Sequence, residues 1–478
     1  AGEADIQAAK IAAGKDLTVG TTKGQLNIAG LRNTFTGYIS KGKLDELQTT
    51  LNFMEKQQVQ YDQEIANIKL DIRALEAKFP RGGSFFRKRI ILSEEYFNQN
   101  PSDKIAYDSL RQKLAFSEKQ LEKIKFDIQA TNESIKLIQN PAAGHEHKSA
   151  VLSGQNINLL SAQGINIESA KIEASKQANL QAAGLLPVVS EEDAKQGEMR
   201  SAINIGGLFD TYEYGQRSSN NYAYMIFNQP SEIYGEMGVN IFAPGQSADS
   251  RIVINASDII SDSGKVTLKS YGDLSLTAGQ GELYTYNKHS YTKRSGKLKI
   301  KKKTITEIKE YNNVKPDASL LSGGKGLDIQ SGGNIYAYAT LFDAPKGSIN
   351  LTASKALKLF AVEELNYNKL ESHKKSSFLG ITYNKENSSN SKKMHTALPS
   401  KLVAEAVNTR SGWDTLLEGT EFKTSLEGAT IQAGVGENAR KDAKIILQGI
   451  KTTVQKEESS ESNAVVWQSM AGSGSVVE

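Results

Sequence analysis

The sequence predicts an all-β fold, a right-handed parallel β-helix with an inserted antiparallel α-helical coiled-coil hairpin and extruded β-hairpins. Three observations lead to this prediction. Apolar–polar–apolar triplets recur every seven or eight residues, two long segments repeat apolar residues at heptad spacing, and polar excursions separate the blocks of triplets. The triplets define the coils, the heptads define the helical insertion, and the excursions define the hairpins.

The triplets are clearest between residues 156 and 184. They are Ile157-Asn158-Leu159, Ile165-Asn166-Ile167, Ile172-Glu173-Ala174 and Leu180-Gln181-Ala182. Such a triplet is a short strand with one inward and one outward face. The close spacing leaves no room for crossover helices, so stacked coils of about 22 residues, each with three strands and three bends, are predicted. Glycines at 14, 20, 24 and 30 are expected at bends, where a positive φ is often required.

Apolar residues follow heptad spacing from Leu44 to Phe79 and again from Tyr107 to Ile138. Two equal arms of this kind predict an antiparallel coiled-coil hairpin. Pro80 and the Asn100-Pro101 pair break the helices at the far end. Residues 84–99 are expected to form a short third helix across the tip.

The predicted organisation alternates coils with insertions. It consists of coils at 1–40, the helical hairpin at 41–141, coils at 142–184, an irregular insertion with an aromatic hairpin at 185–250, and coils at 251–478 with extruded hairpins near 282–315, 362–400 and 454–478.

Composition narrows the classes of function. The net charge of +4 arises from 58 basic and 54 acidic residues, so any electrostatic site has to be local. The absence of cysteine excludes disulfides and thiolate chemistry. No apolar run reaches the length of a membrane span, and the first residues do not resemble a signal peptide. The coil pattern at both ends predicts a segment of a longer chain.

Some parallel β-helices are polysaccharide lyases or hydrolases, which need carboxylates that converge on one groove. Asp258, Asp262 and Asp273 fall near bends at unrelated positions, and 191–193 lies in the irregular insertion. We therefore predict no catalytic residue and no cofactor.

Two motifs are compatible with metal binding. The segment His145-Glu146-His147 contains two potential ligands, although a solvated linker is the simpler interpretation. Residues 323–329, GGKGLDI, resemble one calcium-binding nonapeptide, but such sites need consecutive copies, so a bend is predicted instead. No metal site is predicted.

One excursion carries a cluster of lysines: Lys297, Lys299, Lys301, Lys302 and Lys303. They are candidates for binding a polyanion such as lipopolysaccharide, a sulfated glycan or nucleic acid, the last of which is not favoured. The alternative is that these lysines protect an exposed strand edge from pairing with other chains.

The tip of the helical hairpin is the main candidate for partner binding, because aromatic and basic residues coincide there. The candidate residues are Arg81, Phe85, Phe86, Arg87, Lys88 and Arg89. In the alternative interpretation, Phe86, Ile90 and Phe97 pack the tip onto the helical arms.

Coils interrupted by such excursions resemble the haemagglutinin-repeat region of the filamentous haemagglutinin family, large bacterial proteins exported by two-partner secretion. The segments that carry the resemblance include GDLSLTAGQGELYTYNKHSYTK, GSINLTASKALKLFAVEELNYNKLESHKKSSFLGIT, LLEGTEFKTSLEGATIQAG and VVWQSMAGSGSVVE. With 1–40 and 150–184 they cover about two-thirds of the chain. The tripeptide Tyr-Asn-Lys occurs in the first two excursions, at Tyr286 and Tyr367.

The resemblance implies a non-catalytic stalk and recognition segment at the cell surface or secreted, exported across the outer membrane of a Gram-negative bacterium. The implied partners are an outer-membrane two-partner-secretion transporter and a receptor on a neighbouring bacterial or host cell. The favoured function is that of a contact-dependent growth inhibition effector, which binds a neighbouring cell and supports toxin delivery. The alternatives are an adhesin for host cells or glycans and a polysaccharide-degrading enzyme.

Overall fold

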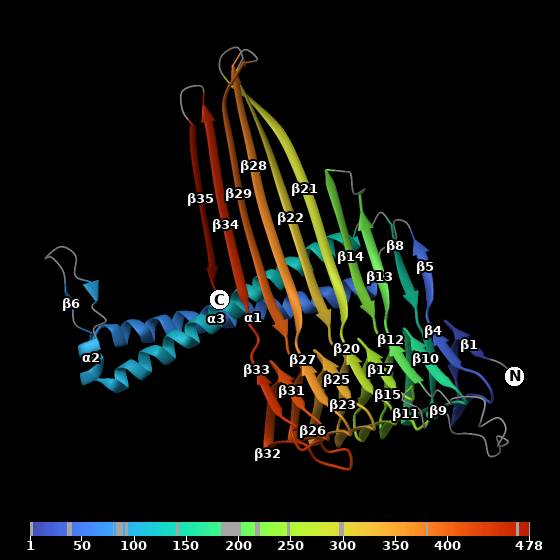
Figure 1. Ribbon diagram of the computed structural model, residues 1–478. Helices are drawn as coiled ribbons and strands as arrows, with labels where there is room; N and C mark the ends of the chain where they lie inside the picture. Colours follow the sequence, from blue (N-terminus) through green and yellow to red (C-terminus); the bar gives the residue numbers. More distant parts are fainter. Residues whose placement is uncertain are drawn as a thin grey trace. The chain divides into compact units, whose positions relative to one another are not determined.

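The computed structural model describes residues 3–35, 41–79, 81–82, 89–90, 94–139, 143–182, 202–215, 220–245, 249–295, 301–378, 381–464 and 468–477. The chain divides into two compact units. One unit contains Tyr38–Pro141, and the other contains Ala1–Gly37 with Ala142–Glu478. The first is helical and the second is built from strands (Figure 1).

The helical unit is a long hairpin of α1 (Lys41–Glu76) and α3 (Pro101–Gln139), as the heptad spacing predicts. The apolar heptad positions are buried between the arms: Ile65, Ile68, Ile72 and Leu75 pack with Leu114 and Leu121. Proline at the first position of α3 suits a helix start, because the first turn has no intrahelical acceptor for its N–H groups.

The tip differs from the expected helix over 84–99. Only α2 (Glu94–Gln99) is helical there among the described residues. Before it, β6 (Arg81–Gly82) pairs antiparallel with β7 (Arg89–Ile90). The expected third helix is therefore shorter, because a two-residue ribbon takes up part of the segment.

Ten of the described strands form a parallel sheet, which we call the first parallel sheet. In spatial order they are β1 (Ala4–Gln7), β4 (Leu26–Ala29), β10 (Gly164–Glu168), β12 (Ala202–Gly206), β17 (Ile252–Asn255), β20 (Leu274–Thr277), β25 (Ile335–Tyr338), β27 (Leu357–Phe360), β31 (Thr415–Glu418) and β33 (Ile445–Gln448).

Thirteen described strands form the second parallel sheet. They are β2 (Lys10–Ala12), β3 (Leu17–Thr21), β9 (Ala150–Ser161), β11 (Ala170–Ala182), β15 (Glu232–Gly235), β16 (Gly238–Ala243), β18 (Asp258–Ser261), β19 (Lys265–Ser270), β23 (Leu320–Gly323), β24 (Gly326–Ser331), β26 (Leu341–Ala353), β30 (Lys401–Ser411) and β32 (Glu421–Ala433).

The second sheet consists of two ribbons joined by its long strands. β11 pairs with β15 through its first half and with β16 through its second half, with a register shift between Ala174 and Gln177. We call the two halves the β15 ribbon and the β16 ribbon. β24, the second half of β26, β30 and β32 continue the β16 ribbon.

The register confirms the predicted repeat length. Ala4 pairs with Leu26, and Ile252 pairs with Leu274, so in these circuits the chain returns to the first sheet after 22 residues. From β4 to β31 the inward apolar residues of both sheets join one core, in which Leu159, Ile165 and Leu274 are fully buried. Burial of these side chains is the main favourable term that holds the stack together.

Every second circuit extrudes strands into a third, antiparallel sheet (Figure 1). After β1, β10, β17, β25 and β31 the chain passes directly to the second parallel sheet, whereas after β4, β12, β20, β27 and β33 it enters the antiparallel sheet. Its ten described strands are β5 (Leu31–Phe35), β8 (Ala143–Lys148), β13 (Leu208–Tyr214), β14 (Asn221–Gln229), β21 (Gly279–Ser295), β22 (Lys301–Asp317), β28 (Val362–Phe378), β29 (Ile381–Leu398), β34 (Thr453–Ala464) and β35 (Gln468–Val477).

The region 185–250 is more regular than expected. β12 belongs to the first parallel sheet, and β15 and β16 belong to the second, so the circuits continue through this region. The expected aromatic hairpin is present as β13 and β14, in which Tyr212 pairs with Met225. Residues 183–201 lie outside the described part of the chain.

Glycines 14, 24 and 30 lie between strands, as expected, and Gly20 lies within β3, but none of the four has the expected positive φ. At five other corners the φ is positive, and the residues there are Ala8, Ser169, Ala256, Ala339 and Gly419. Each directly follows a first-sheet strand from which the chain passes straight to the second sheet. The left-handed corner therefore marks the circuits without a hairpin.

Candidate functional site

The hairpin tip is described only in part. Arg81 pairs with Ile90, and Gly82 pairs with Arg89, so two of the candidate arginines lie on neighbouring strands of the β6–β7 ribbon. Phe85, Phe86, Arg87 and Lys88 lie outside the described residues. The tip thus stays a prediction.

An aromatic cluster closes the helical hairpin next to this ribbon. The Phe79 ring meets the rings of Tyr96, Phe97 and Tyr107 edge-on, at centroid distances of 5.3, 5.5 and 5.4 Å. The Tyr96 hydroxyl donates to Asp103 Oδ2 at 2.9 Å, and this hydrogen bond raises the pKa of Tyr96. Phe97 packs against the arms, as one of the two interpretations of the tip predicted.

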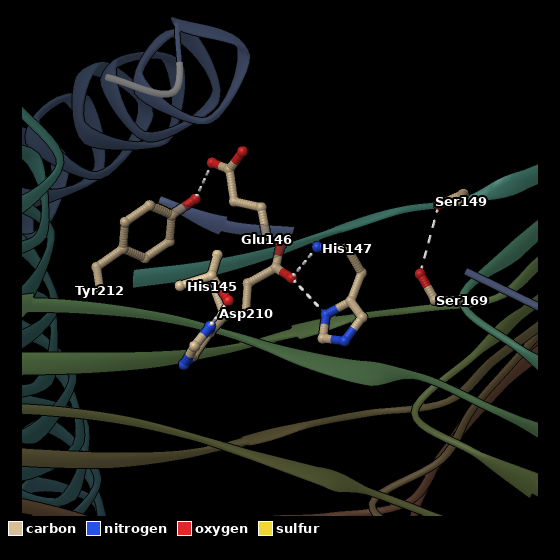
Figure 2. Close-up of polar contacts among 8 residues, drawn as sticks. His145, Glu146, His147, Ser149, Ser169, Asp210 and Tyr212 are labelled. Carbon is tan, nitrogen blue, oxygen red and sulfur yellow. Dashed lines mark hydrogen bonds and ion pairs between the residues drawn. The ribbon is translucent and has the colours of Figure 1, made fainter. Parts of the chain in front are cut away.

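The helical unit is inserted at the turn of the β5–β8 hairpin, and a polar cluster lies on β8 (Figure 2). Asp210 Oδ1, on β13, accepts hydrogen bonds from the His147 backbone N–H at 2.8 Å and lies 2.9 Å from His147 Nδ1. The His147 side chain is only 8% exposed and the Asp210 side chain only 11%. Burial raises the pKa of Asp210, and the contact with His147 opposes this rise. A solvated linker was the wrong interpretation of this segment.

The neighbouring residues of β8 have separate partners. Glu146 accepts a hydrogen bond from the Tyr212 hydroxyl (Figure 2). His145 Nδ1 lies 3.1 Å from Thr34 Oγ1. In the described parts of the chain, no group of three or more His, Cys, Asp or Glu residues is placed to hold a metal ion. The cluster ties β8 to both of its neighbours in the antiparallel sheet, β5 and β13.

The described lysines of the basic excursion lie on β22. Lys301, Lys302 and Lys303 are exposed and stand opposite Ser295, Arg294 and Lys293 of β21. β22 also pairs with β28 on its other side, so it is an interior strand and the edge-protection interpretation is wrong. Lys297 and Lys299 lie outside the described residues. Polyanion binding by these lysines stays a prediction.

A band of tyrosines crosses two neighbouring strands of the antiparallel sheet, β14 and β21. Tyr224 stands opposite Tyr284, and Tyr222 stands opposite Tyr286. The Tyr224 and Tyr284 rings stack with centroids 5.6 Å apart. Burial, followed by the nearby Glu310, raises the pKa of Tyr284 to about 12. Sequence reasoning missed this band, because the segments that contribute to it lie far apart in the chain.

The carboxylates considered for catalysis do not converge in the structure. Asp262 accepts a hydrogen bond from the Tyr234 hydroxyl, and Asp273 accepts from the backbone and side chain of Asn334. Asp258 pairs in register with Glu232 on the outer face of the β15 ribbon. Residues 191–193 are outside the described part.

The GGKGLDI segment forms the bend between β23 and β24, as predicted. Gly326 has a φ of 128°, and a Cβ on Gly324 would lie 1.9 Å from the backbone oxygen of Asp262. Glycine is thus required for close backbone approach.

In the described helices, no segment is long and apolar enough to cross a membrane.

Comparison with known proteins gives one positive result. A family model described as hemagglutinin repeat matches residues 110–203. The match begins within α3 and extends over β8, β9, β10 and β11 into β12. The comparisons with curated proteins and with solved structures found no match. The chain therefore carries a hemagglutinin repeat over residues 110–203, which confirms the resemblance on which the functional expectations rest.

Proposed function

We propose that this chain is a non-catalytic stalk and recognition segment of a large secreted protein of the filamentous haemagglutinin type. The hemagglutinin repeat supports this proposal, since proteins with this repeat are typically secreted or surface-exposed. The chain is exported by two-partner secretion across the outer membrane of a Gram-negative bacterium.

The stalk in this proposal is a right-handed parallel β-helix. Its support is the return of the chain to the first parallel sheet after 22 residues in circuits such as β1 to β4 and β17 to β20, with one apolar core that extends from β4 to β31. Parallel strands joined by crossovers adopt the right-handed connection in nearly all known cases. Each circuit contacts only its neighbours, so such a stack lengthens without a limit set by a spherical core.

The strongest support for the proposal is a contrast: the circuits of the parallel sheets repeat, whereas the segments extruded from them differ from one another. Alternate circuits extrude strands, and the first extruded pair, β5 with β8, holds the whole helical unit at its turn. A rigid repeating support with one unlike appendage is suited to presenting that appendage. We therefore assign recognition to the helical unit and its tip, Arg81, Phe85, Phe86, Arg87, Lys88 and Arg89.

The more specific role is that of a contact-dependent growth inhibition effector, whose tip binds a receptor on a neighbouring bacterium. The test is binding of the fluorescently labelled full chain to Gram-negative cells. Phe85→Ala with Arg87→Ala is expected to reduce binding severalfold, because aromatic and arginine side chains dominate binding hot spots. Phe53→Ala is the matched control, since Phe53 is an exposed phenylalanine (61%) on α1, away from the tip.

Each result has a distinct meaning. Binding to host epithelial cells but not to bacteria would identify an adhesin instead of an effector. Equal binding by the tip variant and the control, with unchanged circular dichroism, would exclude the tip as the recognition element. Release of reducing ends from a polysaccharide by the purified chain would overturn the non-catalytic assignment.

A further inference from the structure

A continuous row of polar side chains runs along the outer face of the β16 ribbon. Strand pairing places one outward residue from each successive strand in register. The row consists of Thr18, Asn158, Asn179, Asn240, Thr267, Asp328, Asn350, Asn408 and Thr430. All are amides or hydroxyls except one carboxylate. Neighbouring strands are ~4.8 Å apart, so the row offers a polar group at that interval.

The amides of this row bond to one another along it. Asn179 Nδ2 donates to Asn158 Oδ1 at 2.9 Å, Asn240 Nδ2 donates to Asn179 Oδ1 at 2.9 Å, and Asn408 Nδ2 donates to Asn350 at 3.1 Å. A side-chain amide has two N–H groups and two oxygen lone pairs. Each such bond uses one N–H of the donor and one lone pair of the acceptor. Further donors and acceptors therefore remain for a ligand that lies along the row.

The C-terminal part of the row is hollowed into a cleft of about 750 Å³. The cleft lies across β24, β26, β30 and β32, and its lining includes Asp328, Asn350, Asn408 and Thr430 of the row. Of the lining residues, Leu327 alone has a large apolar side chain. A polar lining of this kind does not suit a lipid or an apolar peptide, whose binding depends on buried apolar surface.

The charge of the cleft is positive. Lys265, Lys325 and Arg410 line it, all three are exposed, and none has an ion-pair partner among the described residues. The only carboxylate of the lining, Asp328, accepts hydrogen bonds from Gln330 Nε2 at 3.0 and 3.2 Å. Unpaired cations around a polar cleft attract an anionic ligand.

We propose that this face of the β16 ribbon binds an acidic polysaccharide, with the polymer lying along the row and its acid groups against Lys325 and Arg410. A polysaccharide has hydroxyl groups at short, regular intervals, which matches the repeated amides and hydroxyls. Its acid groups complement the unpaired cations. This site is separate from the helical tip, and it does not depend on the proposed function.

The test uses the full chain and three soluble probes of equal length: an oligogalacturonate, a heparin fragment and a neutral dextran. Calorimetry at low salt is expected to show binding of the oligogalacturonate or of heparin, but not of dextran. The preferred acidic probe identifies the acid group as carboxylate or sulfate. Binding is expected to weaken as salt is raised, because exposed charges are screened.

Two variants and one control locate the site. Lys325→Gln with Arg410→Gln is expected to weaken binding by roughly tenfold, because close charge pairs at a binding surface contribute measurably to affinity. Thr430→Glu, at an exposed residue, adds a repelling charge to the row and is expected to have a similar effect. Lys423→Gln removes an exposed charge on the same strand outside the cleft, and it is expected to leave affinity within about twofold.

Four outcomes would overturn the proposal. They are absence of binding to both acidic probes, equal binding of dextran, unchanged affinity in both cleft variants, and tighter binding of a single-stranded oligonucleotide. A further variant, Lys301→Gln with Lys302→Gln and Lys303→Gln, tests the competing basic site on β22. If this variant alone loses binding, the polymer is held by the antiparallel sheet and not by the cleft.

Discussion

Asp258 lies in an unfavourable position for a charged carboxylate. It stands next to Glu232 in the register of β15 and β18, and the nearby cation, Lys171, already pairs with Glu232 at 2.8 Å. Burial, followed by the charge of Glu232, raises the pKa of Asp258 to about 6. The folded chain therefore retains a proton here that the unfolded chain releases at lower pH.

We predict that Asp258→Asn stabilises the chain at neutral pH. Because the pKa of this acid is higher in the folded state, stability falls as pH rises from about 4 to about 6, and the loss persists above that range. Asparagine removes the charge and should raise the free energy of unfolding by about 1 kcal/mol at pH 7, after allowance for solvent screening.

The measurement is urea unfolding of both proteins at pH 4 and at pH 7. The gain should vanish at pH 4, where Asp258 is neutral in the folded chain. Asp442→Asn, at an exposed loop residue, is the control. An equal gain at both pH values would contradict the assigned cause.

The left-handed corners are a second feature of single residues. Ala339 has a φ of 47° and is buried, and it directly follows β25, where Ala337 is buried in an extended strand. Alanine in the left-handed region costs about 1–2 kcal/mol, whereas glycine adopts this region without strain. Sequence reasoning looked for glycines at the bends and missed these corners, because alanine or serine occupies four of the five.

We predict that Ala339→Gly leaves stability unchanged or raises it, because relief of strain offsets the lost methyl contacts. Ala337→Gly, two residues earlier, should lower the free energy of unfolding by about 1 kcal/mol, because glycine weakens a strand interior. Chemical unfolding of the two variants provides the comparison. A larger loss at Ala339 than at Ala337 would show that the corner is not strained.

At the level of elements, the helical hairpin was the part most readily predicted. Its heptad spacing is continuous along each arm, so local pattern and tertiary packing agree. The tip was not predictable in the same way, because the short β6–β7 ribbon depends on pairing across a turn and not on periodicity. Phe79 joins the two parts, since its ring contacts residues of both α2 and α3.

We predict that Phe79→Ala destabilises the helical unit by about 3–4 kcal/mol, because Phe79 is only 3% exposed and its removal leaves a cavity. Thermal unfolding followed at 222 nm, where the helices dominate the signal, should show a lower midpoint. Phe53→Ala, on the same helix and 61% exposed, should change the midpoint little. Equal effects of the two substitutions would exclude the aromatic cluster as a stabilising element.

The extruded strands show the limit of prediction at this level. The hairpin of β21 and β22 was predicted from the alternation of residue types on both sides of its turn, and the antiparallel pairing of the two strands confirms it. That β22 also pairs with β28 was not predictable, because this contact arises only when the circuits are stacked. The same non-local pairing assembles the tyrosine band and removes the exposed edge on which the edge-protection interpretation of the lysines depended.

For the whole chain, the spacing of triplets predicted the length of a circuit and its apolar core. It did not predict the row of polar residues on the β16 ribbon, although Asn158, Asn179 and Asn240 each occupy the centre of a strand pattern. Their neighbours in the row come from other circuits, so the row exists only in the stack. The proposed recognition tip could therefore be inferred from the local composition of the sequence. The proposed polysaccharide site could be identified only from the stacking of the strands.

The final prediction concerns the independence of the two units. Phe35 pairs with Gly144, so the strands that carry the helical unit already lie side by side at the point of insertion. Replacing residues 38–141 with an Asn-Gly turn should therefore leave a simple β5–β8 hairpin, because this dipeptide favours two-residue hairpin turns. The shortened chain should keep its strand signal and its protease resistance, because no described residue of the helical unit belongs to the core of the parallel sheets.

Circular dichroism and limited proteolysis measure the folding of this shortened chain, and the two binding assays measure its function. If recognition belongs to the helical unit, cell binding should disappear while oligogalacturonate or heparin binding is retained. Loss of both activities with an intact strand signal would contradict the separation of the two sites. Unfolding of the shortened chain would show that the strands depend on the helices, in which case Phe79→Ala should also destabilise the parallel sheets.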